Sequence, residues 1–258
     1  MEENVYNRER FRLVHSVYYS RRQYMDKNQR RKRMQALFLV AIVLVACNII
    51  QMSDPVQDVT IACVGDSITY GYGLENREAE CYPVVLQGIL EDNYHVSNLG
   101  VNGVIVQKEG DQSYWDEDRY EQSRTCKPSI VILMLGTNDA KEENWKDSET
   151  FRKDYEAMID SYLNLETKPD VILMTPMTIF SSDVSGESVK AASDEIIREE
   201  AQVIMEIAEA KEVSVIDMYQ ISSEHPEWFS ADGIHPNKDG AAAIAKAVKD
   251  KMQQLIQK

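Results

Sequence analysis

The stretch VTIACVGDSIT, residues 59–69, decides how the rest of the chain is interpreted. Its first part, Val59 to Val64, is a short apolar run rich in β-branched residues, which is typical of a buried strand. Gly65 then breaks the run, and Ser67 follows two residues later. Serine is a weak nucleophile unless a base takes its proton. The chain must therefore supply a base, a group that orients it, and donors for an oxyanion if Ser67 is to react.

Strand and helix patterns alternate from this point to the end of the chain. We expect strands over Val59–Val64, His95–Leu99, Ser129–Leu135, Val171–Met174 and Val213–Asp217. We expect helices over Glu80–Leu90, Phe151–Leu165, Val189–Ala210 and Lys238–Ile256, and we interpret the glutamate-rich helices as having solvated faces. Short strands that are apolar on both faces, separated by helices, predict an α/β fold, a three-layer α/β/α sandwich around a five-stranded parallel sheet. In such open sheets the ligand binds outside the carboxyl ends of the strands.

The charge of the chain is divided unevenly. Residues 1–52 carry a net charge of about +6 and the remainder about −21, which together give −15 for the 258 residues. Nucleic-acid binding needs clustered lysine and arginine, so the acidic body argues against a nucleic-acid partner. The sequence allows no inference about a protein partner.

Four cysteines are present, at positions 47, 63, 81 and 126. None forms a CxxC pair, so we expect no zinc site. We also expect no other metal and no cofactor. Cys63 falls in the first strand and is interpreted as a small core residue. Cys81 and Cys126 form a disulfide only if the domain lies in an oxidising compartment, and the sequence leaves this open.

The N-terminal part combines a basic tail with an apolar segment. Residues 1–33 are polar and basic and end in Arg30-Arg31-Lys32-Arg33, and an apolar run extends from Met34 to Ile50. As a helix this run is about 25 Å long, at the short end for a hydrocarbon layer of about 30 Å. A basic cluster before an N-terminal apolar run is the pattern of export, with the positive flank remaining in the cytoplasm.

The same segment permits three fates. We favour an uncleaved signal anchor over residues 34–52; the alternatives are cleavage of a signal peptide, or a lipoprotein anchored at Cys47, because Leu44-Val45-Ala46-Cys47 resembles a bacterial lipobox. In the favoured case the protein is a single-pass membrane protein with an extracytoplasmic catalytic body. Residues 53–57 are expected to be a linker and residues 58–258 one hydrolase domain.

Four short segments follow strands or precede the last helix. They are Gly65-Asp66-Ser67, Asn98 to Gly103, Gly136-Thr137-Asn138-Asp139 and Asp232-Gly233-Ile234-His235-Pro236. Each alone is most often a turn or a loop. Together, in this order, the four segments closely resemble the SGNH hydrolases, also called the GDSL esterase/lipase family. The resemblance covers residues 58 to 250 and implies the flavodoxin-like fold of that family.

The four residues that give that family its name match at Ser67, Gly100, Asn138 and His235. The serine segment is GDSIT rather than GDSL, which leaves the nucleophile in place. The α/β-hydrolase elbow is disfavoured, because Thr69 stands where G-x-S-x-G needs its last glycine.

Residue chemistry assigns the roles independently of the family. Ser67 is the candidate nucleophile, and His235 is the base that takes its proton and returns it to the leaving alcohol. Asp232 lies three residues before His235, so one turn brings its carboxylate onto the imidazole. The oxyanion donors are expected to be the Asn138 amide and the backbone N–H of Gly100, and the resemblance adds the N–H of Ser67.

Other polar and aromatic residues receive local roles. Asp66 and Asp139 are expected to hold their loops by hydrogen bonds. The aromatic residues of Lys108–Tyr120 either line the substrate cleft or pack among themselves in a surface loop.

These residues predict a serine ester hydrolase that removes acyl, chiefly acetyl, groups from an extracytoplasmic carbohydrate. A lysophospholipase or thioesterase, or an acyltransferase, would use the same residues. The alternative from another class is a non-catalytic glycan-binding module on the same fold. The expected partners are a small-molecule or glycan ester and, through the N-terminal segment, a membrane.

Overall fold

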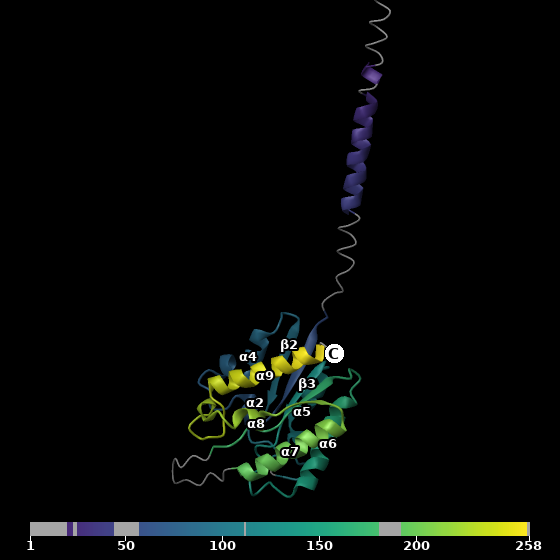
Figure 1. Cartoon of the computed structure of the whole chain (residues 1–258). Helices are drawn as coiled ribbons and strands as arrows, with labels where there is room; N and C mark the ends of the chain where they lie inside the picture. Colours follow the sequence, from purple (N-terminus) through teal and green to yellow (C-terminus); the bar gives the residue numbers. More distant parts are fainter. Residues whose placement is uncertain (1–19, 23–24, 44–56, 111, 181–191, 257–258) are drawn as a thin grey trace, which may run out of the picture. The chain divides into compact units, whose positions relative to one another are not determined.

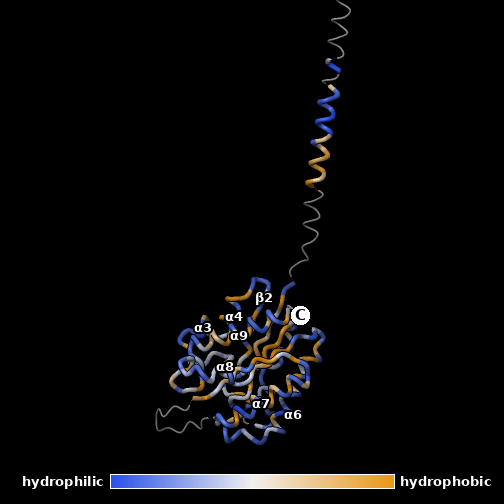
Figure 2. The backbone as a smooth tube through the Cα atoms, viewed as in Figure 1, coloured by the Kyte–Doolittle hydropathy of each residue, from blue (hydrophilic) through white to orange (hydrophobic). Residues whose placement is uncertain are grey.

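The computed structural model describes residues 20–22, 25–43, 57–110, 112–180 and 192–256. The chain divides between residues 56 and 57 into two units, and each is described by itself. In the first unit, residues 20–22 and 25–43 are helical. Figure 2 shows the longer helix changing along its length from hydrophilic, in blue, to hydrophobic, in orange.

The predicted membrane segment, residues 34–52, is described only in part. Residues 34–43 belong to the helix, whereas 44–52, with the lipobox-like sequence and Cys47, lie outside the described residues. Within the described ranges, no helix has both the length and the apolar character needed to cross a bilayer. The transmembrane part of the predicted fold therefore has no support in these residues.

The second unit contains a five-stranded parallel sheet, as predicted. Its strands are β1 (Val59–Gly65), β2 (Tyr94–Gly100), β3 (Ile130–Met134), β4 (Asp170–Met174) and β5 (Ser214–Ile216), in the order β2-β1-β3-β4-β5. Each neighbouring pair is parallel. No strand end differs from its predicted position by more than one residue. The α/β class and the parallel sheet are thus confirmed.

Eight helices of this unit are described. They are α2 (Ser67–Tyr70), α3 (Arg77–Glu80), α4 (Tyr82–Ile89), α5 (Asp118–Thr125), α6 (Ser148–Leu163), α7 (Asp194–Ala210), α8 (Met218–Ser222) and α9 (Lys238–Ile256). Short 3-10 turns lie at Tyr114–Asp116 and Pro226–Trp228. The predicted helices correspond to α4, α6, α7 and α9, although residues 189–191 at the predicted start of α7 lie outside the described residues.

Both faces of the sheet are buried, because β1 sends alternate side chains into two separate cores. Ala62 and Val64 pack into the core that includes residues of α6 and α7. Ile61 and Cys63 pack into the core that includes residues of α4 and α9. Figure 1 shows α9 and α4 together over the sheet, and α6 beside α7. The continuous apolar character of β1 therefore reflects burial on both sides, as the sequence predicted.

The aromatic residues of Lys108–Tyr120 pack inward. Tyr114 is fully buried and its hydroxyl donates to the Leu99 carbonyl at 2.8 Å. The Trp115 indole N–H donates to the Val106 carbonyl at 2.9 Å, and its ring contacts that of Tyr120. These contacts favour the packing interpretation over a cleft lining. The segment leads into α5, a helix that the sequence analysis missed.

The described cysteines are free thiols. Cys81 is buried and accepts a hydrogen bond from the Asn98 amide, whereas Cys126 donates to the Ser123 carbonyl. The disulfide that the sequence left open is therefore not formed. Burial raises the pKa of the Cys63 thiol to about 12, which suits its predicted role as a core residue.

The strand order places the predicted site at a change of direction in the sheet. From β1 the chain continues to β2 on one side, and β3 then lies on the other side of β1. Ligands in open parallel sheets bind at such a switch point, outside the carboxyl ends of the strands. Ser67 follows β1 directly and Asn138 follows β3, so both lie beside this point.

Candidate active site

Ser67 is the first residue of α2, the one-turn helix that follows β1. The side chain of Asp66 caps this helix by accepting from the Ile68 N–H at 2.9 Å. As the first residue of a helix, Ser67 has a backbone N–H without an acceptor inside the helix. The side chain is largely buried, at 7% exposed. The local sequence thus places the Ser67 hydroxyl and its backbone N–H together at the carboxyl end of β1.

Ser67, His235 and Asp232 form a chain of hydrogen bonds. Ser67 Oγ lies 2.8 Å from His235 Nε2 although the two residues are 168 positions apart in the sequence. His235 Nδ1 lies 2.7 Å from Asp232 Oδ2. The other oxygen of Asp232 accepts from the backbone N–H groups of Ile234 and His235, each at 2.9 Å. The turn before α9 therefore fixes the carboxylate and the imidazole relative to each other.

This geometry allows proton transfer from the serine hydroxyl. A carboxylate beside Nδ1 holds the proton there, which leaves the lone pair of Nε2 to accept from Ser67. Partial burial pushes the pKa of Asp232 upward, but hydrogen bonds from the His235 side chain and from the two backbone N–H groups outweigh it and lower that pKa. Asp232 is therefore ionised at neutral pH.

Asn138 lies on the loop that follows β3. Its side-chain amide nitrogen donates to the Val104 carbonyl at 3.0 Å, and its backbone carbonyl accepts from the Asn144 side-chain amide at 2.8 Å. An amide nitrogen carries two hydrogens, and the bond to Val104 uses one of them. The loop begins at Gly136, where φ is +133° and a Cβ would lie 2.6 Å from Pro176, so glycine is required.

Asp66 and Asp139 hold their loops, as predicted. Asp66 caps α2. The carboxylate of Asp139 is fully buried and accepts from the backbone N–H groups of Val106 and Gln107 at 3.0–3.1 Å. These bonds join the loop after β2 to the loop after β3. Burial raises the pKa of Asp139 to about 7, against the opposing effect of those donors.

Gly100 has a contact that bears on its predicted role as a donor. Its backbone N–H donates to the Asn98 side chain at 3.1 Å. A Cβ at Gly100 would lie 2.2 Å from the backbone nitrogen of Tyr70, so glycine is needed for α2 to pack against β2. The Asn98 amide also donates to the Thr69 carbonyl at 2.9 Å. Gly100 and Asn98 thus position the helix that carries Ser67, and the oxyanion role of Gly100 stays a prediction.

Glu200 corrects our interpretation of the glutamate-rich helices as solvated. It lies on α7 and is fully buried, and neither carboxyl oxygen has a hydrogen-bond partner among the described residues. A Cβ at Gly136 would lie 2.8 Å from its Oε2, so the carboxyl packs directly behind the Asn138 loop. Burial raises its pKa well above the usual range, and the charges of Asp139 and Asp66 add to that increase.

The raised pKa of Glu200 makes stability fall with increasing pH. Above about pH 4.5 the unfolded chain loses this proton while the folded chain keeps it, so each pH unit weakens folding by up to about 1.4 kcal/mol until the folded pKa is reached. Glu200→Gln keeps the shape and removes the titration. The quantity to follow is the unfolding free energy of Glu200→Gln minus that of the parent chain, measured by urea unfolding at each pH. We expect this difference to increase by at least about 1 kcal/mol from pH 5 to pH 8.

Glu209→Gln is the matched control, because Glu209 is an exposed glutamate on the same helix, away from Glu200. It should leave the pH slope unchanged. A constant difference between Glu200→Gln and the parent chain across this pH range would show that Glu200 is ionised in the folded state.

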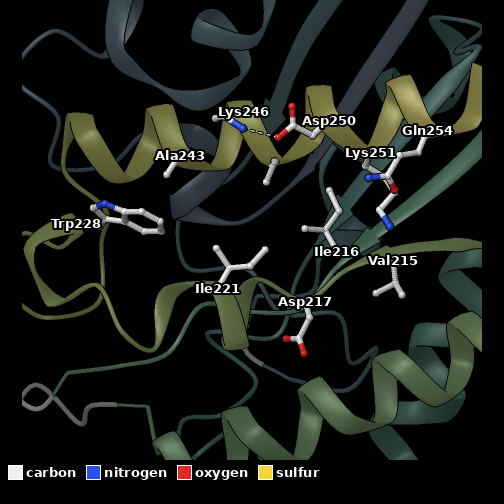
Figure 3. Close-up of a pocket in the computed structure, with 11 residues that line it drawn as sticks. Val215, Ile216, Asp217, Ile221, Trp228, Ala243, Lys246, Asp250, Lys251 and Gln254 are labelled. Carbon is white, nitrogen blue, oxygen red and sulfur yellow. Dashed lines mark hydrogen bonds and ion pairs between the residues drawn. The ribbon is translucent and has the colours of Figure 1, made fainter.

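A separate hollow of about 440 Å³ lies between α9 and the β5–α8 segment (Figure 3). Its walls include Trp228, Ile221, Ile216 and Val215, and the Lys246–Asp250 ion pair lies on α9. None of its lining residues is a predicted site residue. Among the residues that the structure describes, no cluster of histidine, cysteine or acidic side chains is arranged to hold a metal ion.

The sequence analysis missed Tyr72. Its ring lies against that of His235, with centroids 4.7 Å apart and planes at 47°, yet the residue is 52% exposed. The signal in the sequence was an aromatic residue between Gly71 and Gly73, five positions after the candidate nucleophile.

Comparison with known proteins shows which protein family the chain matches. The model of the GDSL-like lipase/acylhydrolase family matches residues 63–243. The chain is 34% identical over 212 residues to an acetylxylan esterase of Xylanibacter ruminicola, a match that covers 75% of this chain and 43% of that protein. It is 21% identical over 141 residues to a GDSL esterase/lipase of Arabidopsis thaliana, with 50% of this chain and 45% of the relative covered. The chain thus spans less than half the length of these curated relatives.

A solved structure has the same fold. A carbohydrate acetylesterase family member from Sinorhizobium meliloti superposes with a TM-score of 0.65 over 78% of this chain and 100% of its own, at 20% sequence identity. At this identity the likeness shows the fold alone.

Proposed function

Because the chain belongs to the GDSL-like lipase/acylhydrolase family, we propose that it is a serine esterase that removes acetyl groups from a carbohydrate. The observation that carries the proposal is the chain of hydrogen bonds from Ser67 through His235 to Asp232, at 2.8 and 2.7 Å. The acetylxylan esterase relative supports the choice of acyl group and of substrate class.

The proposed reaction has two steps. His235 takes the proton of Ser67 as Oγ attacks the ester carbonyl, and the same proton then goes to the sugar oxygen as the C–O bond breaks. Water next attacks the acetyl-serine, with His235 again as base. The acetate leaves and Ser67 regains its proton. Asp232 stabilises the imidazolium that forms in each step.

The developing oxyanion needs donors near Ser67. The Ser67 N–H and the second amide hydrogen of Asn138 are the proposed donors. The third is Gly100, at the end of β2, or Gly103, the other glycine of the Asn98–Gly103 segment. Gly103 directly precedes Val104, whose carbonyl accepts from Asn138. The N–H of Gly100 is shared with Asn98, which favours Gly103.

Asn138→Ala is expected to lower the turnover number by about 10²–10³-fold, because it removes a donor to the transition state. The change also leaves the buried Val104 carbonyl without its Asn138 partner, which should lower the unfolding free energy by about 1–3 kcal/mol. Steady-state kinetics and thermal unfolding measure the two effects. Asn164→Ala, at the exposed end of α6, is the control and should leave turnover unchanged. A folded Asn138→Ala enzyme with unchanged turnover would remove Asn138 from the site.

A substrate panel tests the function. Acetylated xylo-oligosaccharides, p-nitrophenyl esters of increasing chain length, acyl thioesters and lysophospholipids should be compared by kcat/KM, and we expect acetylated sugars to be preferred. A preference for long acyl chains would favour the lipase alternative. An acceptor sugar that competes with water for the acetyl group would favour a transferase. Binding of glycans without any hydrolysis would favour the glycan-binding module.

We further propose that residues 34–52 hold the chain at a membrane with the body outside the cytoplasm, by an uncleaved anchor or by lipidation of Cys47. Support comes from the basic cluster at residues 30–33 and from apolar side chains on the helix, such as Phe38, which is 70% exposed. Protease treatment of intact expressing cells should cleave the body. Incorporation of labelled palmitate that Cys47→Ser abolishes would select the lipoprotein. A body protected in intact cells would contradict the proposal.

A further inference from the structure

A polar groove adjoins the segment that carries His235. It is lined on one side by residues 73–75 and 80, and on the other by Ser230 and residues 237–239. Its volume is about 400 Å³, within the range of about 300–1,000 Å³ of small-molecule sites. The Ser230 N–H donates to the His235 carbonyl at 2.8 Å, so one wall is joined directly to the segment of the base.

Tyr72 links this groove to the reactive pair, through its ring and through the residue that follows it in the chain. Its ring contacts that of His235, and the next residue, Gly73, lines the groove. Its backbone N–H donates to the Ser67 carbonyl at 2.9 Å, which ties the ring's position to the nucleophile. A substrate whose ester carbonyl is at Ser67 Oγ has its alcohol portion next to the imidazole that protonates it, and hence next to Tyr72.

Resting on the proposed function, we propose that Tyr72 and the polar groove bind the sugar that carries the acetyl group, and that they select an uncharged sugar. An exposed aromatic ring gives the apolar face of a sugar a surface to pack on. Carboxylate, amide and hydroxyl groups in the groove match sugar hydroxyls as hydrogen-bond partners.

The charge of the groove supplies the selectivity. Among the described residues, Glu75, Glu80 and Asp239 line it together with a single cation, Lys238. A uronic acid bound there would place a further carboxylate among an excess of carboxylates, and like charges brought together disfavour binding. A neutral acetylated sugar meets no such repulsion.

Two esters separate binding in the groove from the chemistry. Acetylated xylotriose extends into the groove, whereas the methoxy group of methyl acetate is too small to reach it. We expect Tyr72→Ala to lower the ratio of kcat/KM for acetylated xylotriose to that for methyl acetate by about tenfold, chiefly through KM. Tyr72→Phe keeps the ring and should keep the ratio within about twofold.

Charge selection has its own matched pair of variants. Glu75→Lys should raise kcat/KM for a glucuronic-acid-bearing acetylated xylo-oligosaccharide relative to acetylated xylotriose by about tenfold, in line with removal of a like charge. Glu91→Lys makes the same charge change before β2, at the amino end of the sheet, and should leave that ratio unchanged.

The outcomes distinguish this inference from the function on which it rests. If the parent chain hydrolyses both esters but Tyr72→Ala lowers both equally, or shifts the pH profile of both, Tyr72 only packs against His235 and the groove is not the sugar site. The inference would likewise be overturned if Tyr72→Ala left the ratio of kcat/KM for acetylated xylotriose to that for methyl acetate unchanged. It would also be overturned if Glu75→Lys and Glu91→Lys gave the same ratio of kcat/KM for the acidic oligosaccharide to that for acetylated xylotriose. If the parent chain hydrolyses neither ester, the proposed function itself fails.

Discussion

Ser67→Ala is expected to lower ester hydrolysis by about 10⁶-fold. The Ser67 hydroxyl oxygen is the nucleophile on which the covalent route depends. Among the described residues, no other hydroxyl lies within hydrogen-bond distance of His235 Nε2 to replace it. What remains is the slower attack of water within a site that still holds the substrate. The change removes one oxygen from a side chain that is already largely buried, so the fold should persist.

Two measurements check this result independently. Acetate release in a pH-stat reports turnover, and a fluorophosphonate probe reports a reactive serine whatever the natural substrate is. Both should be lost in Ser67→Ala. Ser161→Ala is the control, because Ser161 lies on α6 and its hydroxyl bonds the Met158 carbonyl of the same helix.

The two readouts also separate the competing functions. Labelling that persists in Ser67→Ala would assign the nucleophile to another residue. A parent chain that neither reacts with the probe nor releases acetate, yet binds glycans, would be the non-catalytic module. Loss of both signals with the fold intact leaves esterase and acyltransferase, which the acceptor experiment distinguishes.

The sheet was predictable because its strands are buried on both faces. Continuous runs such as residues 59–64 have the same pattern whichever helices cover them, so strand ends agreed within one residue. The helix α5 was not predictable in this way. Its sequence, DRYEQSRT, has no apolar stripe, and Ser123 is its one buried residue. Its position depends on Tyr120 packing against Tyr114 and against Tyr162, and Tyr162 lies far along the chain on α6.

The residues of the candidate site also fall into those that the sequence predicted and those that it did not. Motif spacing brought Ser67, Asp232 and His235 to attention, and the backbone brings their side chains into hydrogen-bond contact. Glu200 could not be found from sequence, because it occupies one of many glutamate positions on an amphipathic helix. Only the approach of α7 to the loop after β3 distinguishes it. Likewise the contact of the Gly100 N–H with the Asn98 side chain, at the end of β2, has no signature in composition or spacing.

Asp232→Asn is expected to lower the turnover number by about 10³–10⁴-fold while the protein stays folded. Asparagine keeps an oxygen that can accept from the N–H groups of Ile234 and His235, so we expect the turn before α9 to keep its conformation. Its amide hydrogens, however, would face His235 Nδ1. The imidazole would then carry its proton on Nε2, and Nε2 could no longer accept the proton of Ser67. The side chain of Asp232 is 42% exposed, so water already screens part of its interaction with the imidazolium. For this reason the expected range extends down to about 10³-fold.

The measurement must separate orientation of the base from general damage. Rates of acetate release and of fluorophosphonate labelling should fall together in Asp232→Asn, because both need Ser67 to lose its proton to His235. Asp170→Asn, at the exposed start of β4, provides the control and should change neither rate. Thermal unfolding should shift by no more than a few degrees in either variant. A fall in turnover of less than about tenfold in a folded Asp232→Asn protein would mean that another group orients His235, and the 2.7 Å contact between Asp232 and His235 would then be structural.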